Sequence, residues 1–193
     1  MEIVHYPHPA LRWKSKPVQE INADLRAKID EMFALMYEAK GVGLAANQVA
    51  VPLRFFIVNI TRNSEEADEE LVFINPEITK RKGSTEDEEG CLSLPQLYGQ
   101  VRRAEDIVIE AFDLNGQPFE MELKDLPGRV VQHETDHLDG VIFPDRMTDT
   151  ARHELEPQLK DFESIFRRKQ EAGEIPSDRE LERQLRAQEP GSS

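Results

Sequence analysis

The chain has 193 residues, 38% of them hydrophobic and 32% charged, a composition typical of one ordinary soluble domain. Its formal net charge of −14 argues against direct binding to nucleic acid, which requires clustered lysine and arginine. No stretch approaches the ~18 consecutive apolar residues of a membrane span, and the first residues resemble neither a signal peptide nor a transit peptide. We therefore expect a cytoplasmic protein that uses neither a membrane nor nucleic acid as a direct partner.

The single cysteine, Cys91, cannot form an internal disulfide, which fits a reducing compartment. Acidic residues gather in two runs, at 64–70 and 86–89. The first run is typical of a solvated loop. The second lies directly before Gly90 and Cys91, so it can shape the rim of a site.

The first predicted helix begins after Asn22, a favourable N-cap residue, and ends near Ala39, before Gly41. Hydrophobic residues at helical spacing indicate one buried face: Leu25, Ile29, Met32, Phe33 and Met36. Strands are predicted over 54–60 and 71–74. Two alternating segments, 107–113 and 117–123, predict a hairpin around Asn115-Gly116, a dipeptide that favours a type I′ turn.

A central helix should run from about Leu126 to Leu138. After Thr148-Asp149, hydrophobic residues again recur at helical spacing: Leu155, Leu159, Phe162, Ile165 and Phe166. The polar C-terminal segment, 171–193, predicts a marginal helix or a disordered tail. The expected organisation is one α+β domain over 1–170, with antiparallel strands around the central helix and further helices near both ends.

The strongest chemical signal is the sequence QHETDH at 132–137, within the predicted central helix. His133 and His137 lie one helical turn apart, so both imidazoles can reach one metal ion. Glu134 lies on the adjoining face, where it can accept a proton from water instead of binding the metal. Apolar residues on both sides of this segment indicate a buried helix, in which unpaired histidine and glutamate side chains would be costly.

A catalytic metal site of this kind needs a third protein ligand. A histidine six residues after His137 would complete one known pattern, but Phe143 stands there. Glu154 or Glu156 remains an alternative, as in other zinc peptidases, although both are expected to be exposed at the start of a charged helix. Cys91 is the other candidate, because a thiolate is a good ligand for borderline and soft first-row metals.

Three segments resemble, in the family's order, the signature motifs of peptide deformylases: GVGLAANQ at 41–48, EGCLS at 89–93 and QHETDHL at 132–138. The resemblance covers roughly residues 1–150. It implies a metal-dependent hydrolase that removes the formyl group from the N-formylmethionine of nascent polypeptides and releases formate.

The resemblance also implies roles for individual residues. One divalent ion would be held by Cys91, His133 and His137. Ferrous iron is the implied ion, with zinc, nickel or cobalt able to substitute. Glu134 would act as general base, and the Leu92 N–H and the Gln48 side chain would donate to the oxyanion. Asn47 differs from the family's usual residue there and is predicted to be neutral.

A further implied set would bind the substrate and accept its methionine side chain: Gly43, Leu44, Gly90, Leu126, Val130 and Tyr98. Ordinary core packing is the alternative for Leu126 and Val130. Tyr98 stands where many relatives carry an arginine, so one polar contact to the peptide is either absent or made differently. Glu89, Arg103 and Asp136 are candidates for hydrogen bonds that orient the ligands from behind.

Two other functions stay open at this stage. One is a zinc peptidase with a downstream glutamate ligand, and the other is a deformylase-like protein that binds without catalysing. Because nascent chains would be the substrates, the ribosome is a further candidate partner for the C-terminal helix and the segment after it.

Overall fold

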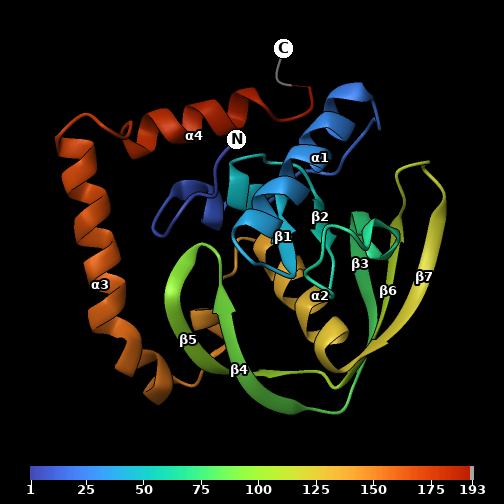
Figure 1. Cartoon of the computed structure of the whole chain (residues 1–193). Coiled ribbons are helices and arrows are strands. Elements are labelled where there is room, and N and C mark those ends of the chain that lie inside the picture. Colours follow the sequence, from blue (N-terminus) through green and yellow to red (C-terminus); the bar gives the residue numbers. More distant parts are fainter. Residues whose placement is uncertain (192–193) are drawn as a thin grey trace.

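The computed structural model describes residues 1–191 and has an α+β fold in which both sheets are antiparallel (Figure 1). The larger sheet has the strand order β1-β2-β3-β6-β7. Its strands are β1 (Gly43–Ala45), β2 (Phe55–Val58), β3 (Leu71–Lys82), β6 (Asp106–Phe112) and β7 (Pro118–Lys124). The smaller sheet pairs β4 (Thr85–Cys91) with β5 (Leu94–Arg103). The predicted fold class is confirmed.

Four α-helices accompany the sheets within residues 1–191: α1 (Ala23–Glu38), α2 (Asp125–Leu138), α3 (Asp149–Glu171) and α4 (Asp178–Ala187). Short 3₁₀ helices are η1 (Pro9–Arg12), η2 (Ala46–Val49), η3 (Ala67–Glu69) and η4 (Phe143–Arg146). No helix in the described part of the chain combines the length and the apolar character that crossing a membrane requires.

Helix α1 follows its predicted bounds closely. The Asn22 side chain accepts a hydrogen bond from the Leu25 N–H at 3.0 Å, which satisfies one of the free donors at the helix start. The predicted hydrophobic stripe is buried and packs in one cluster with Leu44, Phe55 and Ile57 of the sheet. Burial of this stripe attaches α1 to the sheet.

Helix α2 lies between the two sheets, so every residue from Gly128 to Leu138 is buried. One face of the helix packs Val130, Val131 and Leu138 in a cluster with side chains of the larger sheet. The opposite face points its polar side chains at β4 and β5, where Arg129 donates to the carbonyls of Val101 and Thr85. The predicted central helix is confirmed, and its two faces meet chemically different partners.

The hairpin between β6 and β7 is confirmed, but its predicted type I′ turn is wrong. Gly116 has a φ of +74°, whereas Asn115 does not adopt a positive φ. The Gly116 N–H donates to the Asp113 carbonyl, and the Asp113 carboxylate accepts from the N–H groups of Asn115 and Gln117 at 2.8 Å each. This side-chain capping by Asp113 holds a longer loop than the two-residue turn.

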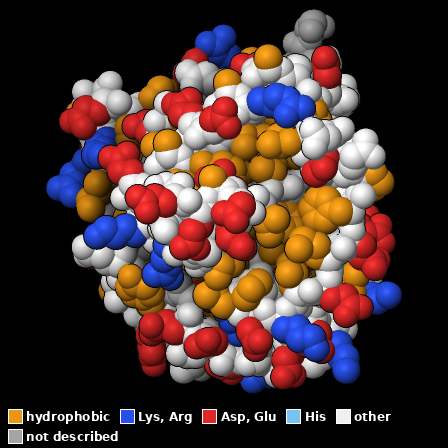
Figure 2. Space-filling model, turned by 45° about the vertical axis from the view of Figure 1, so that its right-hand side comes forward, with side chains coloured by type: hydrophobic (Ala, Val, Ile, Leu, Met, Phe, Trp, Pro, Cys, Tyr) orange, Lys and Arg blue, Asp and Glu red, His pale blue; other side chains and the backbone are white. Residues whose placement is uncertain are grey.

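The acidic runs differ in structure. Residues 64–70 are mostly exposed and contain only the short η3, as expected for a solvated loop. Residues 86–89 form part of β4, which the sequence did not predict as a strand. The pairing brings opposite charges together, since Glu86 lies opposite Arg102 and accepts from it at 3.2 Å. Figure 2 shows acidic side chains around an apolar patch on one face of the molecule.

The C-terminal segment contains a packed helix, α4, that contacts η1 near the start of the chain. Leu181 and Leu185 are buried, the Trp13 Nε1–H donates to Glu189 at 2.9 Å, and Arg186 lies over the Trp13 ring. These contacts join the two ends of the chain, so local composition could not reveal them. The predicted disorder of residues 192 and 193 lies outside the described residues.

We predict that Leu185→Ala lowers the free energy of unfolding by about 2 kcal/mol, because it removes a fully buried side chain between α4 and η1. Urea denaturation measures the change. The control is Gln184→Ala, an exposed neighbour on the same helix, which should change stability by only about 0.5 kcal/mol or less. Equal stability of the two variants would show that α4 contributes nothing to the folded domain.

Candidate metal centre

Three predicted ligands converge between β4 and α2. Cys91 is the last residue of β4, and His133 and His137 lie one turn apart on α2. The Cys91 Sγ lies 3.3 Å from the His137 Nε2, which lies 3.1 Å from the His133 Nε2. All three donor atoms lie within 4.8 Å of one another. Glu154 and Glu156 are on α3, outside this cluster, so the structure gives no support to a downstream glutamate ligand.

The donor set fits one divalent ion. One sulfur and two imidazole nitrogens provide three ligands and leave a fourth position for water or substrate, as in catalytic metal sites. Burial lowers the pKa of His137 well below its usual value, and the neighbouring His133 lowers it further, so its Nε2 can offer a lone pair. A proton and a metal ion would compete for the same three atoms.

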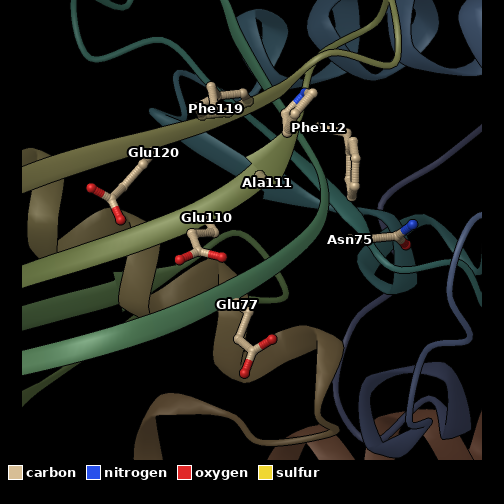
Figure 3. A pocket seen from close by; sticks show the side chains of 8 residues that line it. Asn75, Glu77, Glu110, Ala111, Phe112, Phe119 and Glu120 are labelled. Atoms are coloured by element: carbon tan, nitrogen blue, oxygen red, sulfur yellow. The ribbon is translucent and has the colours of Figure 1, made fainter.

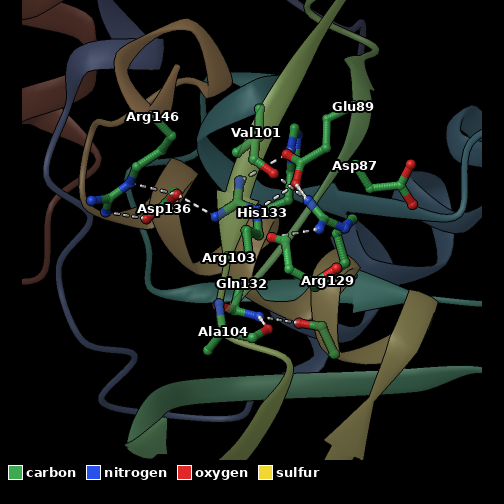
Figure 4. Close-up of polar contacts among 12 residues, drawn as sticks. Asp87, Glu89, Val101, Arg103, Ala104, Arg129, Gln132, His133, Asp136 and Arg146 are labelled. Atoms are coloured by element: carbon green, nitrogen blue, oxygen red, sulfur yellow. Dashed lines mark hydrogen bonds and ion pairs between the residues drawn. The ribbon is translucent and has the colours of Figure 1, made fainter. Parts of the chain in front are cut away.

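Glu89 supports this cluster from behind (Figure 4). Its Oε2 lies 3.0 Å from the His133 Nδ1, so a proton on Nδ1 leaves the His133 Nε2 free to bind a metal. Arg103 donates to both carboxylate oxygens at 2.5 and 2.8 Å, and Arg129 donates to Oε1 at 2.7 Å. Burial alone would raise the pKa of Glu89, but the hydrogen bonds from His133 and Arg103 lower it well below its usual range.

The predicted support from Arg103 and Asp136 is confirmed, since Arg103 is buried with 7% of its surface exposed. Its third nitrogen, Nη1, donates to Asp136 at 2.8 Å, and Asp136 also accepts two hydrogen bonds from Arg146. Arg129 was missed by the sequence analysis. A charged residue beside the apolar residues of a buried helix was the available signal, because such a charge requires a partner.

Gln48 and Ser93 surround the sulfur of Cys91. The Gln48 side chain is fully buried and donates from Nε2 to the Cys91 Sγ at 3.4 Å and to the Ser93 hydroxyl at 3.2 Å. Its Oε1 accepts from the Ala45 N–H at 2.8 Å, which fixes the orientation of the amide. Leu92 lies between Cys91 and Ser93, at the turn that joins β4 to β5. The predicted donors thus lie beside the metal-ligand cluster.

Asn47 was predicted to be neutral, yet its side chain is fully buried and donates to the carbonyl of the ligand His137. The contact joins η2 to the end of α2. No pattern in the sequence signals it, because the two residues are 90 positions apart.

Glu134 lies on the face of α2 that meets β1. Only 4% of its surface is exposed, and burial raises the pKa of its carboxyl to about 7. A Cβ added at Gly43 would lie 2.6 Å from the Glu134 Oε1, so only glycine allows this carboxylate its place against β1. The other oxygen, Oε2, has no hydrogen-bond partner within residues 1–191. A buried carboxylate with one unpartnered oxygen beside the metal ligands is suited to proton transfer.

The proposed substrate-binding residues have different surroundings. Leu44 is fully buried in the core with α1, and Val130 is buried against Gly43. Leu126 is 47% exposed, so core packing does not account for it. Tyr98 of β5, which is 59% exposed, pairs with Gly90 of β4 and places its ring against it.

A hollow of about 350 Å³ at the other end of the larger sheet is not this site (Figure 3). Three glutamates and two phenylalanines stand among its lining residues: Asn75, Glu77, Glu110, Ala111, Phe112, Pro118, Phe119 and Glu120. Because none of these lining residues is a histidine or cysteine, the hollow lacks the nitrogen and sulfur ligands of the cluster on α2.

Comparisons with known proteins agree with this geometry. The family model described as polypeptide deformylase matches residues 1–153. A peptide deformylase of Rhodopirellula baltica is 45% identical over 184 residues, which cover 95% of this chain and 91% of that protein. One of Chromobacterium violaceum is 46% identical over 160 residues, which cover 83% of this chain and 94% of that protein.

Solved structures give the same result. Peptide deformylase 1B of Arabidopsis thaliana, in complex with an inhibitor, is similar with a TM-score of 0.83 and 38% identity, covering 92% of this chain and 96% of that one. A Plasmodium falciparum peptide deformylase has a TM-score of 0.83 and 35% identity, and the match covers 86% of this chain and 97% of that one. The chain belongs to the polypeptide deformylase family, metal-dependent hydrolases that remove the formyl group from nascent peptides.

Proposed function

We propose that Cys91, His133 and His137 hold the single metal ion of the deformylase reaction and that Glu134 is its general base. The observation that carries this proposal is the convergence of three donor atoms within 4.8 Å, next to a buried carboxylate whose pKa burial raises to about 7. No observation favours a binding protein without activity, since all five residues of the predicted reaction centre are present: Gln48, Cys91, His133, Glu134 and His137.

Ferrous iron is the ion that we propose for this site, with zinc, nickel or cobalt able to replace it. The proposal rests on the resemblance of the three sequence motifs to those of deformylases. The donor set agrees with it, because two imidazoles and one thiolate suit all of these borderline first-row ions.

A divalent ion held by these ligands would polarise the formyl carbonyl and lower the pKa of water. Glu134 then accepts the proton of the attacking water and delivers it to the amine as the carbon–nitrogen bond breaks. The Gln48 side chain and the Leu92 N–H donate to the oxygen that becomes negative, as in an oxyanion hole. Formate and a free α-amine leave, so the atoms of one water are divided between the two products.

We place the methionine side chain of the substrate in a pocket formed by Gly43, Val130 and Leu126. Val130 and Gly43 are in contact beside Glu134, and the exposed Leu126 lies at the start of α2. Leu44 would contribute its backbone, because its side chain belongs to the core. Tyr98 and Gly90 would form the other wall, with the Tyr98 ring replacing the arginine contact of many relatives.

Formylated nascent peptides are the substrates of this enzyme. We propose the cytoplasm as its location and the ribosome, from which such chains emerge, as a further partner of α3 and α4. The net charge of −14 supports neither nucleic acid nor an anionic membrane surface as a direct ligand.

The Glu134→Ala variant tests the proposed base. It should bind as much metal as the wild-type enzyme, because Glu134 is not a ligand, while kcat falls by about 10²–10⁴-fold. Metal content and formate release from a formyl-Met peptide are measured on the same preparation. Glu120→Ala, an exposed glutamate on β7, is the control and should keep full activity. A turnover number unchanged by Glu134→Ala would remove this residue from the mechanism.

The Glu89→Gln variant tests the support of His133. The substitution removes the negative charge opposite Arg103 and Arg129, and the new amide no longer fixes the proton on His133 Nδ1. We expect metal affinity to fall by about 10–100-fold, measured by competition with a chelator. Glu88→Gln, the exposed neighbour on β4, should retain its metal like the wild type. Equal retention by both variants would contradict the role given to Glu89.

A further inference from the structure

A cavity of about 460 Å³ lies beside α2, between that helix and the ends of β3 and β5. Its walls come from the end of β3, the turn before β4, the end of β5, the outer face of α2 and η4. The lining residues are Ile78, Arg81, Gly83, Ser84, Arg102, Arg103, Ala104, Gln132, Thr135, Asp136, Asp139 and Arg146. None of the three metal ligands is among them, so the cavity is distinct from the reaction centre.

The lining has a charge opposite to that of the whole chain. Four arginines and two aspartates line the cavity, a surplus of positive charge in a protein of net charge −14. Asp139 is also paired outside the lining, since Arg54 donates to it at 2.7 Å. Concave surfaces of one sign concentrate ions of the other sign. The cavity is therefore a place where an anion is attracted locally, although the chain as a whole carries a net negative charge.

The arginines are arranged as a buried floor and an exposed mouth. Arg103 is buried at the floor, where its guanidinium nitrogens already donate to Glu89 and Asp136 (Figure 4). Arg81, Arg102 and Arg146 are exposed at the mouth. Arg81 forms no ion pair with any residue of the described chain, 1–191, and Arg102 donates to Glu86 through Nη2 alone. Arg146 donates to Asp136 from Nε and Nη2, which leaves its Nη1. Guanidinium N–H groups at the mouth therefore remain available to a ligand.

The two neutral polar side chains that α2 contributes to the wall are already satisfied. Gln132 exchanges two hydrogen bonds with the backbone of Ala104 and donates a third to the Gly128 carbonyl. The Thr135 hydroxyl donates to the Val131 carbonyl. Recognition in this cavity consequently depends on charge and on guanidinium geometry, and these features select oxyanions.

We propose that this cavity binds a small phosphate-class oxyanion through Arg81, Arg102 and Arg146. A tetrahedral dianion matches the surplus of positive charge and can accept forked hydrogen bonds from more than one guanidinium group. The recess has the volume of a small-molecule site. An extended nucleic-acid chain is disfavoured, because its other phosphates would lie against a protein of net charge −14.

Isothermal titration calorimetry of the metal-loaded enzyme with inorganic phosphate tests this proposal, in a buffer free of other multivalent anions. We expect one phosphate per chain and about a tenfold rise in Kd for Arg81→Gln combined with Arg102→Gln. Arg179→Gln, an exposed arginine on α4, is the matched control and should leave Kd unchanged. Both variants should keep the wild-type rate of deformylation without phosphate, which separates this test from that of the reaction centre.

Several results would overturn the proposal. These are the absence of binding to the wild-type enzyme, a Kd that the double variant does not change, and an equal loss in Arg179→Gln. Phosphate bound directly to the metal would leave the Kd of the double variant unchanged. A short RNA that binds more tightly than phosphate, and through the same two arginines, would show that the cavity serves a polyanion instead.

Discussion

The buried carboxylate of Glu89 is the contact on which the arrangement of the metal centre depends. It lies between three partners, His133, Arg103 and Arg129, and none of these groups is well solvated. An unpaired charge at this depth would cost several kcal/mol, so these charges are tolerated only as a set. Because Glu89 belongs to β4 while His133 and Arg129 belong to α2, the same contacts fix the small sheet against the central helix.

The position of Cys91 follows from that attachment. Cys91 is two residues after Glu89 on β4, so the strand that carries the supporting carboxylate also delivers the sulfur to the two histidines. Asn47 and Gln48 of η2 complete the cluster by bonding the His137 carbonyl and the Cys91 sulfur. Helix α2 thus presents an apolar face to the larger sheet and a polar face to β4 and β5, and it must be buried on both.

The features that sequence reasoning predicted well are local, because the residues that form them lie close together in the chain. His133, Glu134 and His137 fall within two turns of one helix, so their relative placement follows from helical geometry alone. Asn22 and the hydrophobic stripe of α1 are similarly local. The choice of Cys91 over Glu154 or Glu156 needed the resemblance to a family, because only the tertiary fold brings β4 to α2.

The misses have physical reasons of the same kind. Acidic residues have low strand propensity, so the sequence did not predict β4 as a strand, although Arg102 and Arg103 of β5 balance its charge. The turn at Asn115 was mispredicted because the Asp113 side chain outweighs the dipeptide preference. The helix α4 depends on Trp13, near the other end of the chain. Such long-range contacts leave no periodic trace in the sequence.

The measurement that tests the central claim most directly is formate release from a formyl-Met peptide by protein purified without oxygen, with the acetylated peptide alongside. The account predicts rapid release from the formylated peptide only, by protein that carries one metal ion per chain, with loss of activity in air if the ion is ferrous and bound by Cys91. A folded, metal-loaded protein that releases no formate would contradict it, because the assembled ligands and Glu134 would then not suffice for the reaction.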